Sequence, residues 1–340
     1  MSDDYLWDGS GRPDPEIARL ETVLLPLRHR EAPPVVRLAA GRARVLLAAA
    51  AAVAAVAAAT GALRDGAPGW DVTAIAGTPR LGAMPLAGSG RWRVGEWLVT
   101  DEAARAAADV GDVGRVIVGP LSRLRLVDAR PDRQRMALAE GRIHATIFAP
   151  PLRFFVDTPA ATAVDLGCEY TLETDAAGNG LLRVRSGWVG FEWQGLETFV
   201  PAGARCLTRA GRGPGTPFFE TARPAFQDAL VRLDFEARGG ERTSVLGLVL
   251  AQARPRDAMS LWHLLRRLPP PERPTVFERL AVLVPPPEAV GREAAVRGDP
   301  AALDLWWDAL DLDDVTWWRK WKGGWPRAPA PRPPANPQRP

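Results

Sequence analysis

Residues that bind metals or act as nucleophiles are scarce in this sequence. It has only two cysteines and three histidines in 340 residues, and they lie far apart in the chain. This spacing excludes a local zinc-finger motif and a local Cys/His catalytic pair. The sequence also lacks a P-loop, a G-x-S-x-G nucleophile motif and a metal-binding triad. We therefore expect no enzymatic activity, no cofactor and no metal.

A large excess of one charge is also absent. The 43 basic and 40 acidic residues give a formal net charge of only +3. A protein with one dominant basic face for nucleic acid would carry a larger excess. Nucleic acid is therefore not expected as a partner. A hydrophobic fraction of 46% is still sufficient for at least one buried core.

One segment lacks charge altogether. Residues 45–63, VLLAAAAAVAAVAAATGAL, contain no charged residue, no proline and no amide side chain. A helix of this length spans about 28 Å, close to the hydrocarbon thickness of a bilayer. The alternatives are an alanine-rich soluble helix and a cleaved signal peptide, which would need an unusually long charged region. We predict one transmembrane helix.

The arginines beside this segment set its expected orientation. Several precede it and fewer follow it, namely Arg28, Arg30, Arg37, Arg42 and Arg44 before it, and Arg64 and Arg80 after it. Positively charged flanks stay in the cytoplasm. We therefore expect a single-pass protein of the inner membrane, with a cytoplasmic N-terminus and with the bulk of the chain in the periplasm.

The cytoplasmic segment, residues 1–44, contains one predicted amphipathic helix. Its start is marked by Asp14 as the cap, Pro15 at the first helical position and Glu16 in the first turn. A lone helix cannot bury its own apolar side, so the membrane surface, a second copy or a cytoplasmic regulator is expected to cover it. The candidate partner-binding residues are Ile17, Leu20, Val23, Leu24 and Leu27.

The middle of the chain is predicted to be rich in strands. Residues 64–90 contain much glycine, alanine and proline and are predicted to be a linker with one strand near 70–75. Over residues 91–213, period-two runs of β-branched and aromatic residues alternate with turn residues. This pattern favours a mainly β domain, either a β-sandwich or a short β-solenoid. The clearest hairpin connection is DAAGNG at 175–180.

Helical spacing replaces strand spacing after residue 213. Residues 214–316 carry apolar residues at intervals of three and four, interrupted by prolines, which predicts a small all-α domain. Residues 317–340 form a Trp/basic and proline-rich tail. Six tryptophans in the last predicted helix and the tail are candidates for contact with an anionic polymer or a membrane, with core packing as the alternative: Trp306, Trp307, Trp317, Trp318, Trp321 and Trp325.

A series of short motifs recurs along the β region. The motifs are GEWLVT at 95–100, VIVGP at 116–120, LRL at 124–126, LAEGRI at 138–143, FVDTP at 155–159, AVDLG at 163–167, LRV at 182–184 and GWV at 187–189. The glycines fall where a strand must turn, and the alternating runs offer one buried face. In their order and spacing, over about a third of the chain, these motifs resemble the FecR-like periplasmic signalling domains.

This resemblance implies signal transduction across the envelope. In the FecR family, a periplasmic domain receives a signal and the cytoplasmic end controls an extracytoplasmic-function sigma factor. The short cytoplasmic segment and the helical C-terminal module depart from the pattern of that family. The alternative is a membrane-anchored periplasmic binding or scaffolding module for a protein or glycan ligand, without control of a sigma factor.

Two cysteines fall inside the predicted periplasmic domain, Cys168 and Cys206. The periplasm is oxidising, so these residues form a candidate disulfide. In the chain-entropy account, a bridge closing this loop stabilises the fold by about 4 kcal/mol. Two buried thiols are the alternative, because the spacing does not define the Cα separation.

Acidic and aromatic side chains also provide candidate sites. Even spacing can place Glu169 with Glu173, or Asp157 with Asp165, on one sheet face, as general acid/base hydrolysis requires. Alternating acids are equally typical of a solvated sheet face. His144 lies within a predicted strand and is expected to be an exposed or packed imidazole. Trp188 and Trp193 suggest a stacking platform for a glycan, with core packing as the alternative.

Overall fold

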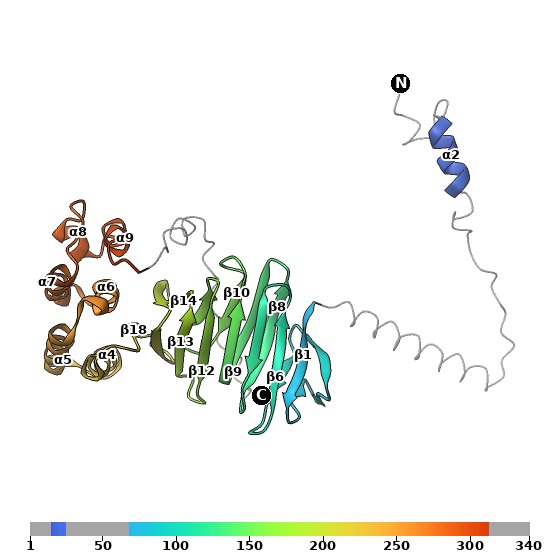
Figure 1. Cartoon of the computed structure of the whole chain (residues 1–340), viewed down its shortest axis with the longest axis horizontal. Coiled ribbons are helices and arrows are strands. Elements are labelled where there is room, and N and C mark those ends of the chain that lie inside the picture. The colour runs from blue at the N-terminus through green and yellow to red at the C-terminus, as the bar shows by residue number, and fades with distance from the viewer. Residues whose placement is uncertain (1–14, 25–67, 313–340) are drawn as a thin grey trace, which may run out of the picture. The chain divides into compact units, whose positions relative to one another are not determined.

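The computed structural model describes residues 15–24 and 68–312 and divides the chain into two units, residues 1–65 and 66–340 (Figure 1). In the first unit the described residues form the helix α2 (Pro15–Leu24). The predicted amphipathic helix is therefore confirmed, with Pro15 at its start. Because proline has no N–H to satisfy and its φ is already helical, it suits the first turn.

The predicted membrane segment, residues 45–63, lies outside the described residues. Among the residues that are described, none of the helices has the length and apolar character needed to cross a bilayer.

The second unit consists of two mostly antiparallel sheets and a group of helices. The first sheet runs in the order β4 (Ser89–Arg93), β1 (Gly69–Ala76), β6 (Arg105–Val110), β7 (Gly114–Val118), β9 (Arg133–Ile147), β12 (Glu169–Thr174), β13 (Gly180–Ser186) and β16 (Ala204–Arg209). Two short strands, β17 (Gly213–Pro214) and β18 (Phe218–Phe219), pair with β16.

The second sheet shares β9 with the first. Its order is β3 (Met84–Pro85), β2 (Arg80–Leu81), β5 (Trp97–Val99), β8 (Arg123–Arg130), β9, β10 (Phe154–Asp157), β11 (Thr162–Asp165), β14 (Trp188–Trp193) and β15 (Leu196–Pro201). Only the pairing of β9 with β10 is parallel among the described strands. This confirms the prediction of a mainly β domain.

Strand β9 passes from one sheet to the other at Gly141. Residues before Gly141 pair with β8 and β10, and the residues from Gly141 on pair with β7 and β12. Gly141 has a φ of +103°, and a Cβ there would lie 2.3 Å from the Cα of Ser122. Only glycine fits, because any side chain would overlap the backbone of Ser122.

The two sheets face each other across a tryptophan-rich core. Trp70 of the first sheet and Phe154 of the second lie with ring centroids 6.1 Å apart. Trp92 packs edge-on against Trp70 at 5.5 Å. The indole N–H of Trp70 donates to Oε1 of Gln134 at 2.7 Å, so the only polar atom of this large ring is satisfied inside the core.

The strand predicted near residues 70–75 is confirmed as β1, but the interpretation of the surrounding residues 69–90 as a linker is wrong. This segment contains β1 to β3 and the start of β4, and β1 lies between β4 and β6 in the first sheet. Its small residues resemble a tether, but Trp70 and Val72 are buried. A strand can be anchored by two buried side chains on its inner face even where its other side chains are small.

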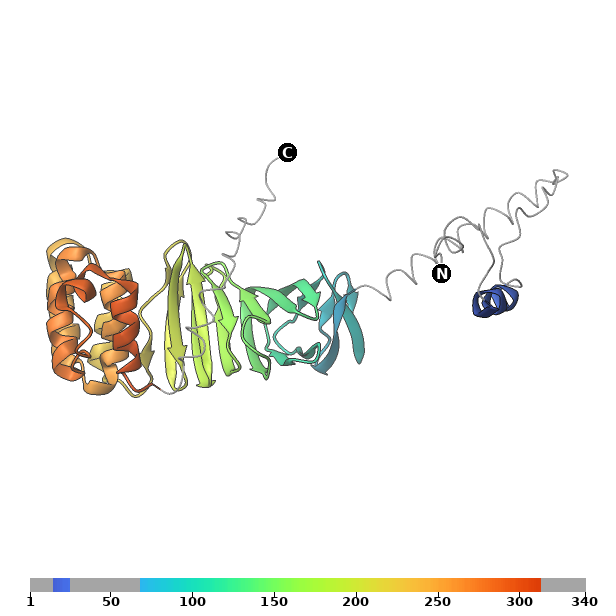
Figure 2. The ribbon, with the colours of Figure 1, turned by 90° about the horizontal axis from the view of Figure 1, so that it is seen from above.

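Helices follow the β region as the sequence pattern predicts. They are α4 (Pro224–Phe235), α5 (Gly239–Gln252), α6 (Ala258–Arg267), α7 (Arg273–Leu283), α8 (Arg292–Arg297) and α9 (Pro300–Asp308), with short 3-10 turns η2 (Pro255–Asp257) and η3 (Pro270–Glu272). They gather at the end of the unit opposite to β1 (Figure 2). The helical C-terminal part is thereby confirmed.

The helices share one hydrophobic core with the sheets. Trp307 of α9 packs against Trp188 of β14 and Phe199 of β15, each with ring centroids 5.9 Å apart. The backbone N–H of Phe199 donates to Nε2 of His263 at 3.1 Å, and Nδ1 of His263 donates to the carbonyl of Met259. Burial lowers the pKa of His263 to about 3, so the ring is neutral and can accept this bond.

Trp70 provides a test of whether β1 belongs to the folded body. Trp70→Ala is expected to reduce the free energy of unfolding by about 3–5 kcal/mol, since it empties a buried site. The matched control is Ile75→Ala in the same strand, because Ile75 is 52% exposed. Thermal unfolding of the full chain in detergent measures both. Equal midpoints for the two variants would contradict the assignment of β1 to the core.

Candidate functional site: a trough on the first sheet and the exposed face of α2

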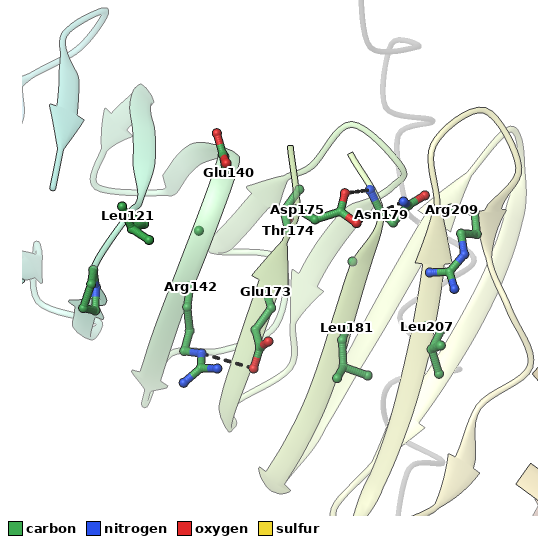
Figure 3. A pocket seen from close by; sticks show the side chains of 13 residues that line it. Leu121, Glu140, Arg142, Glu173, Thr174, Asp175, Asn179, Leu181, Leu207 and Arg209 are labelled. Atoms are coloured by element: carbon green, nitrogen blue, oxygen red, sulfur yellow. Dashed lines mark hydrogen bonds and ion pairs between the residues drawn. The ribbon is translucent and has the colours of Figure 1, made fainter. Parts of the chain in front are cut away.

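A trough of about 570 Å³ crosses the outer face of the first sheet, at the middle of β9 and near the ends of β12, β13 and β16 (Figure 3). Its apolar part comes from Leu181 on β13 and Leu207 on β16, which point outward from neighbouring strands, and from Leu121 in the loop before β8. Leucines on the solvent side of a sheet depart from the usual alternation. They leave apolar surface available to a ligand.

Charged groups of both signs surround these leucines. Nε of Arg142 lies 3.1 Å from Oε1 of Glu173, and this ion pair spans β9 and β12. Glu140, Asp175 and Arg209 complete the charged part of the lining. A trough with apolar contacts and both charges suits an extended chain with mixed side chains better than a small, uniformly charged ligand.

The predicted hairpin at 175–180 closes one end of the trough. Asp175 accepts hydrogen bonds from the backbone N–H of Asn179 at 2.8 Å and from its side-chain amide at 3.0 Å. These bonds lower the pKa of the Asp175 carboxyl. Gly178 takes the left-handed conformation that the turn requires, with φ +80°. The hairpin therefore presents a fixed rim, although sequence reasoning identified it only as a turn.

The exposed face of α2 is the second candidate site. Leu20, Val23 and Leu24 have exposed fractions of 60%, 70% and 54%. They lie on one side of the helix at the predicted spacing, and Thr22 lies on the other side. For Ile17 only the backbone is described, and Leu27 lies outside the described residues.

The candidate disulfide between Cys168 and Cys206 is not formed, since both residues are free, buried thiols. Register explains their separation. Cys206 on β16 pairs with Leu182 on β13, which in turn pairs with Leu172 on β12, four residues beyond Cys168. The offset is roughly 10 Å across two strands and 13 Å along them. A disulfide needs Cα atoms within about 7 Å, so the expectation is corrected.

Each thiol has its own partner in the core. Sγ of Cys168 donates to Oδ2 of Asp165 at 2.7 Å, and Sγ of Cys206 lies 3.3 Å from the carbonyl of Gly215. Burial raises the pKa of Cys168 well above its usual value and that of Cys206 to about 12. Both are therefore poor nucleophiles and poor metal ligands.

Asp165 is the least expected group in the core. It is 2% exposed and accepts hydrogen bonds from the Cys168 thiol and from the backbone N–H of Gly167 at 2.7 Å. Burial raises its pKa to about 7, although these hydrogen bonds act in the opposite direction. The hydroxyl of Tyr170 is also buried, with no hydrogen-bond partner among the described residues. A sequence pattern gives no signal for such a cluster, because it depends on which strand faces inward.

The two candidate catalytic acid pairs are arranged differently in the structure. Glu169 and Glu173 share the outer face of β12, as predicted, but each is bound to a basic group. Oε1 of Glu169 lies 3.2 Å from Nε2 of His144 and 3.4 Å from Nη1 of Arg185. Glu173 is bound by Arg142. This arrangement is that of a solvated, ion-paired sheet face.

Asp157 and Asp165 do not share a face. They belong to separate strands, β10 and β11, which a turn at 158–161 connects. Asp157 accepts from Arg135 at 2.6 and 2.7 Å and from the Thr162 hydroxyl at 2.8 Å. The even spacing that placed them together holds only within one continuous strand, so this prediction was wrong.

Most of the candidate tryptophans that the structure describes pack in the hydrophobic core. Trp188 is 9% exposed and contacts Trp307, and Trp193 lies against Gly213, where a Cβ would approach its ring to 2.4 Å. Trp306 is fully buried and donates to the carbonyl of Val284 at 3.1 Å. The tail tryptophans lie outside the described residues, namely Trp317, Trp318, Trp321 and Trp325.

Comparison with known proteins gives a weak structural similarity. No family model matches the chain, and no curated protein matches it. Two crystal structures of a candidate anti-sigma factor from Parabacteroides distasonis are similar to it, with 13% identity and a TM-score of 0.32. The match covers 40% of this chain and 64% of that protein, less than two thirds of its length. A likeness this weak carries no functional argument.

The Asp165 carboxyl predicts how stability depends on pH. Because its pKa is about 7 in the fold and 3.8 when unfolded, the folded state keeps a proton that the unfolded state loses between these values. Stability is therefore fully present below about pH 4 and falls as pH rises through 7, by up to about 4 kcal/mol.

Asp165→Asn should remove this loss. The unfolding midpoints of the variant and of the wild type are expected to be similar at pH 4 and to separate by pH 8, with the variant more stable. The pH 4 measurement controls for packing changes, since both side chains are then uncharged. Parallel pH profiles for the two proteins would show that Asp165 does not titrate as described.

Proposed function

We propose that the chain is a non-enzymatic, FecR-like transducer that passes a signal from the periplasm to a cytoplasmic regulator of transcription, an extracytoplasmic-function sigma factor. Residues 45–63 anchor it in the inner membrane as a single transmembrane helix. The body formed by residues 68–312 faces the periplasm, where its two β layers act as a sandwich. The motifs that resemble FecR-like domains fall within these layers.

The exposed apolar face of α2 is the observation that carries this proposal. Leu20, Val23 and Leu24 are more than half exposed, and the described part of the first unit supplies nothing that covers them. A helix of ten residues has little stability of its own in water, and burial of one apolar face against a partner stabilises it. The face therefore suits a helix-in-groove contact with a cytoplasmic protein.

The trough supports a second candidate function. With Leu181, Leu207 and the Arg142–Glu173 pair, it provides a binding surface that does not depend on the N-terminal unit. A membrane-anchored periplasmic binding or scaffolding module would use this surface alone. In that case α2 would be dispensable, which separates the two functions by experiment.

Leu20→Asp tests α2 as the output surface. In cells that lack the native gene, the variant should reproduce the transcript changes of the deletion. An unpaired carboxylate in an apolar interface is costly, so partner affinity should fall at least about tenfold. Genome-wide transcript levels provide the measurement, at protein levels matched by immunoblot.

Thr22→Asp is the matched control. It adds the same charge to the same helix on the opposite, exposed side and should retain wild-type regulation. If Leu20→Asp regulates as well as the wild type, the transducer function is excluded and the binding-module function remains. If both variants fail, a general loss of the helix explains the result rather than the loss of one face.

Tags at the two ends test the orientation. In spheroplasts, added protease should remove a tag placed after Pro340 and leave a tag placed before Met1 intact. Deleting residues 45–63 should move the protein to the soluble fraction and protect both tags, since the protein would then stay in the cytoplasm. Recovery of the full-length chain in the soluble fraction without detergent would refute membrane anchoring.

A further inference from the structure

The outer face of the second sheet carries a group of arginines across β2, β5 and β8. Arg80, Arg123 and Arg125 are exposed and surround Trp97 and Val99. Val99 pairs with Arg80 on one side and with Arg123 on the other, and Trp97 pairs with Arg125. These five residues are called the basic face below.

The guanidinium groups of the basic face retain free donors. The Arg123 guanidinium lies 4.3 Å from the centre of the Trp97 ring. Arg125 donates to the carbonyl of Gly95 at 3.2 Å, and Arg80 to that of Ala83 at 3.3 Å. None of the three forms an ion pair with a carboxylate in the part of the chain that the structure describes.

Three arginines on the outer face of the first sheet differ in this respect. Arg115, Arg142 and Arg183 are paired with carboxylates at 2.7, 3.1 and 2.8 Å. On the second sheet, Glu140 stands opposite Arg123 in the strand register, yet it forms no ion pair with it and lines the trough instead. The basic face therefore has unneutralised positive charge beside an indole ring, and an anionic partner complements it.

Covalent connection restricts what lies near this face. Only five residues, 64–68, lie between the end of the predicted membrane segment at 63 and the start of β1 at Gly69. Five extended residues reach at most about 18 Å. β1 and β8 lie at the same end of the second unit, away from the helices (Figures 1 and 2). A bilayer that holds residues 45–63 would therefore lie close to the start of β1, at the same end of the second unit as the basic face.

We propose that the basic face binds the anionic phospholipid headgroups of the membrane that anchors the chain. This inference rests on the membrane anchoring proposed above. Arginine matches phosphate oxygens with several N–H donors, and tryptophan is enriched at the headgroup level. The short connection also makes the contact intramolecular, so that a few arginines suffice. The contact holds the end of the body that contains β1 against the membrane.

Arginine-specific labelling of the full chain in lipid nanodiscs tests this contact. The chain is reconstituted in phosphatidylcholine alone or in an equal mixture of phosphatidylcholine and phosphatidylglycerol, and then treated with phenylglyoxal. Mass spectrometry of the peptides measures the reactivity of each arginine. Reactivity at Arg80, Arg123 and Arg125 should fall about fivefold in the anionic nanodiscs, and 1 M NaCl should restore it.

Arginines that are already paired serve as internal controls. Arg115 and Arg183 should show the same reactivity in both lipids. If Arg80, Arg123 and Arg125 react equally in both lipids, the headgroup contact is refuted. Equal protection in both lipids, lost on dilution to one chain per nanodisc, would mean that a second copy covers the face, which also refutes it.

Failure of the anchor itself gives a different result. A chain that does not insert will not copurify with nanodiscs of either composition, and the labelling comparison is then not reached. The triple variant Arg80→Ala/Arg123→Ala/Arg125→Ala should insert normally. In anionic lipid, acrylamide in the aqueous phase should quench its Trp97 as strongly as in neutral lipid. Arg115→Ala/Arg183→Ala/Arg232→Ala, which removes the same charge from ion-paired sites, should behave as the wild type.

Discussion

The passage of β9 between the two sheets is the constraint on which the rest of the body depends. One strand of fifteen residues belongs to both sheets, and Gly141 marks the point of transfer. The backbone of Ser122 fills the space where a Cβ would lie. The hydroxyl of Ser122 accepts from the N–H of Arg142 at 3.0 Å, and its own N–H donates to Oγ1 of Thr100 at 2.9 Å. Glycine and a small polar network therefore hold the two layers at a fixed separation.

The trough and the basic face both follow from this crossing. The trough has Gly141 in its lining, because β9 turns away there and leaves Arg142 and Glu140 at the edges of a depression. The basic face lies on the other sheet, where β8 pairs with the part of β9 that precedes the glycine. A single backbone irregularity thus places a mixed-charge trough and a cationic face on the outer sides of two different layers.

The buried titratable groups show how the body is unified. His263 must stay neutral to accept from Phe199, and Asp165 must keep its proton in the apolar interior. Their effects on stability oppose each other, since acid disfavours the neutral histidine and base disfavours the protonated carboxyl. One lies where the helices meet β15 and the other lies within the β layers, and the apolar residues around both belong to one hydrophobic core. The sequence boundary at 213 and 214 marks a change of secondary structure within one core.

Local patterns in the sequence were sufficient to predict α2, most strands after residue 91, the hairpin at 175–180 and the helices. Such elements are predictable because periodicity and turn residues act over a few neighbouring positions. These patterns gave the strand near 70–75 but failed to show that residues 69–90 belong to the folded body, where two buried side chains anchor β1. They also failed for Cys168 and Cys206, which are separated by β13. They gave no sign of the trough, the basic face or the Asp165 cluster. Those depend on which strands become neighbours and which face turns inward, and long-range pairing through β9 decides both.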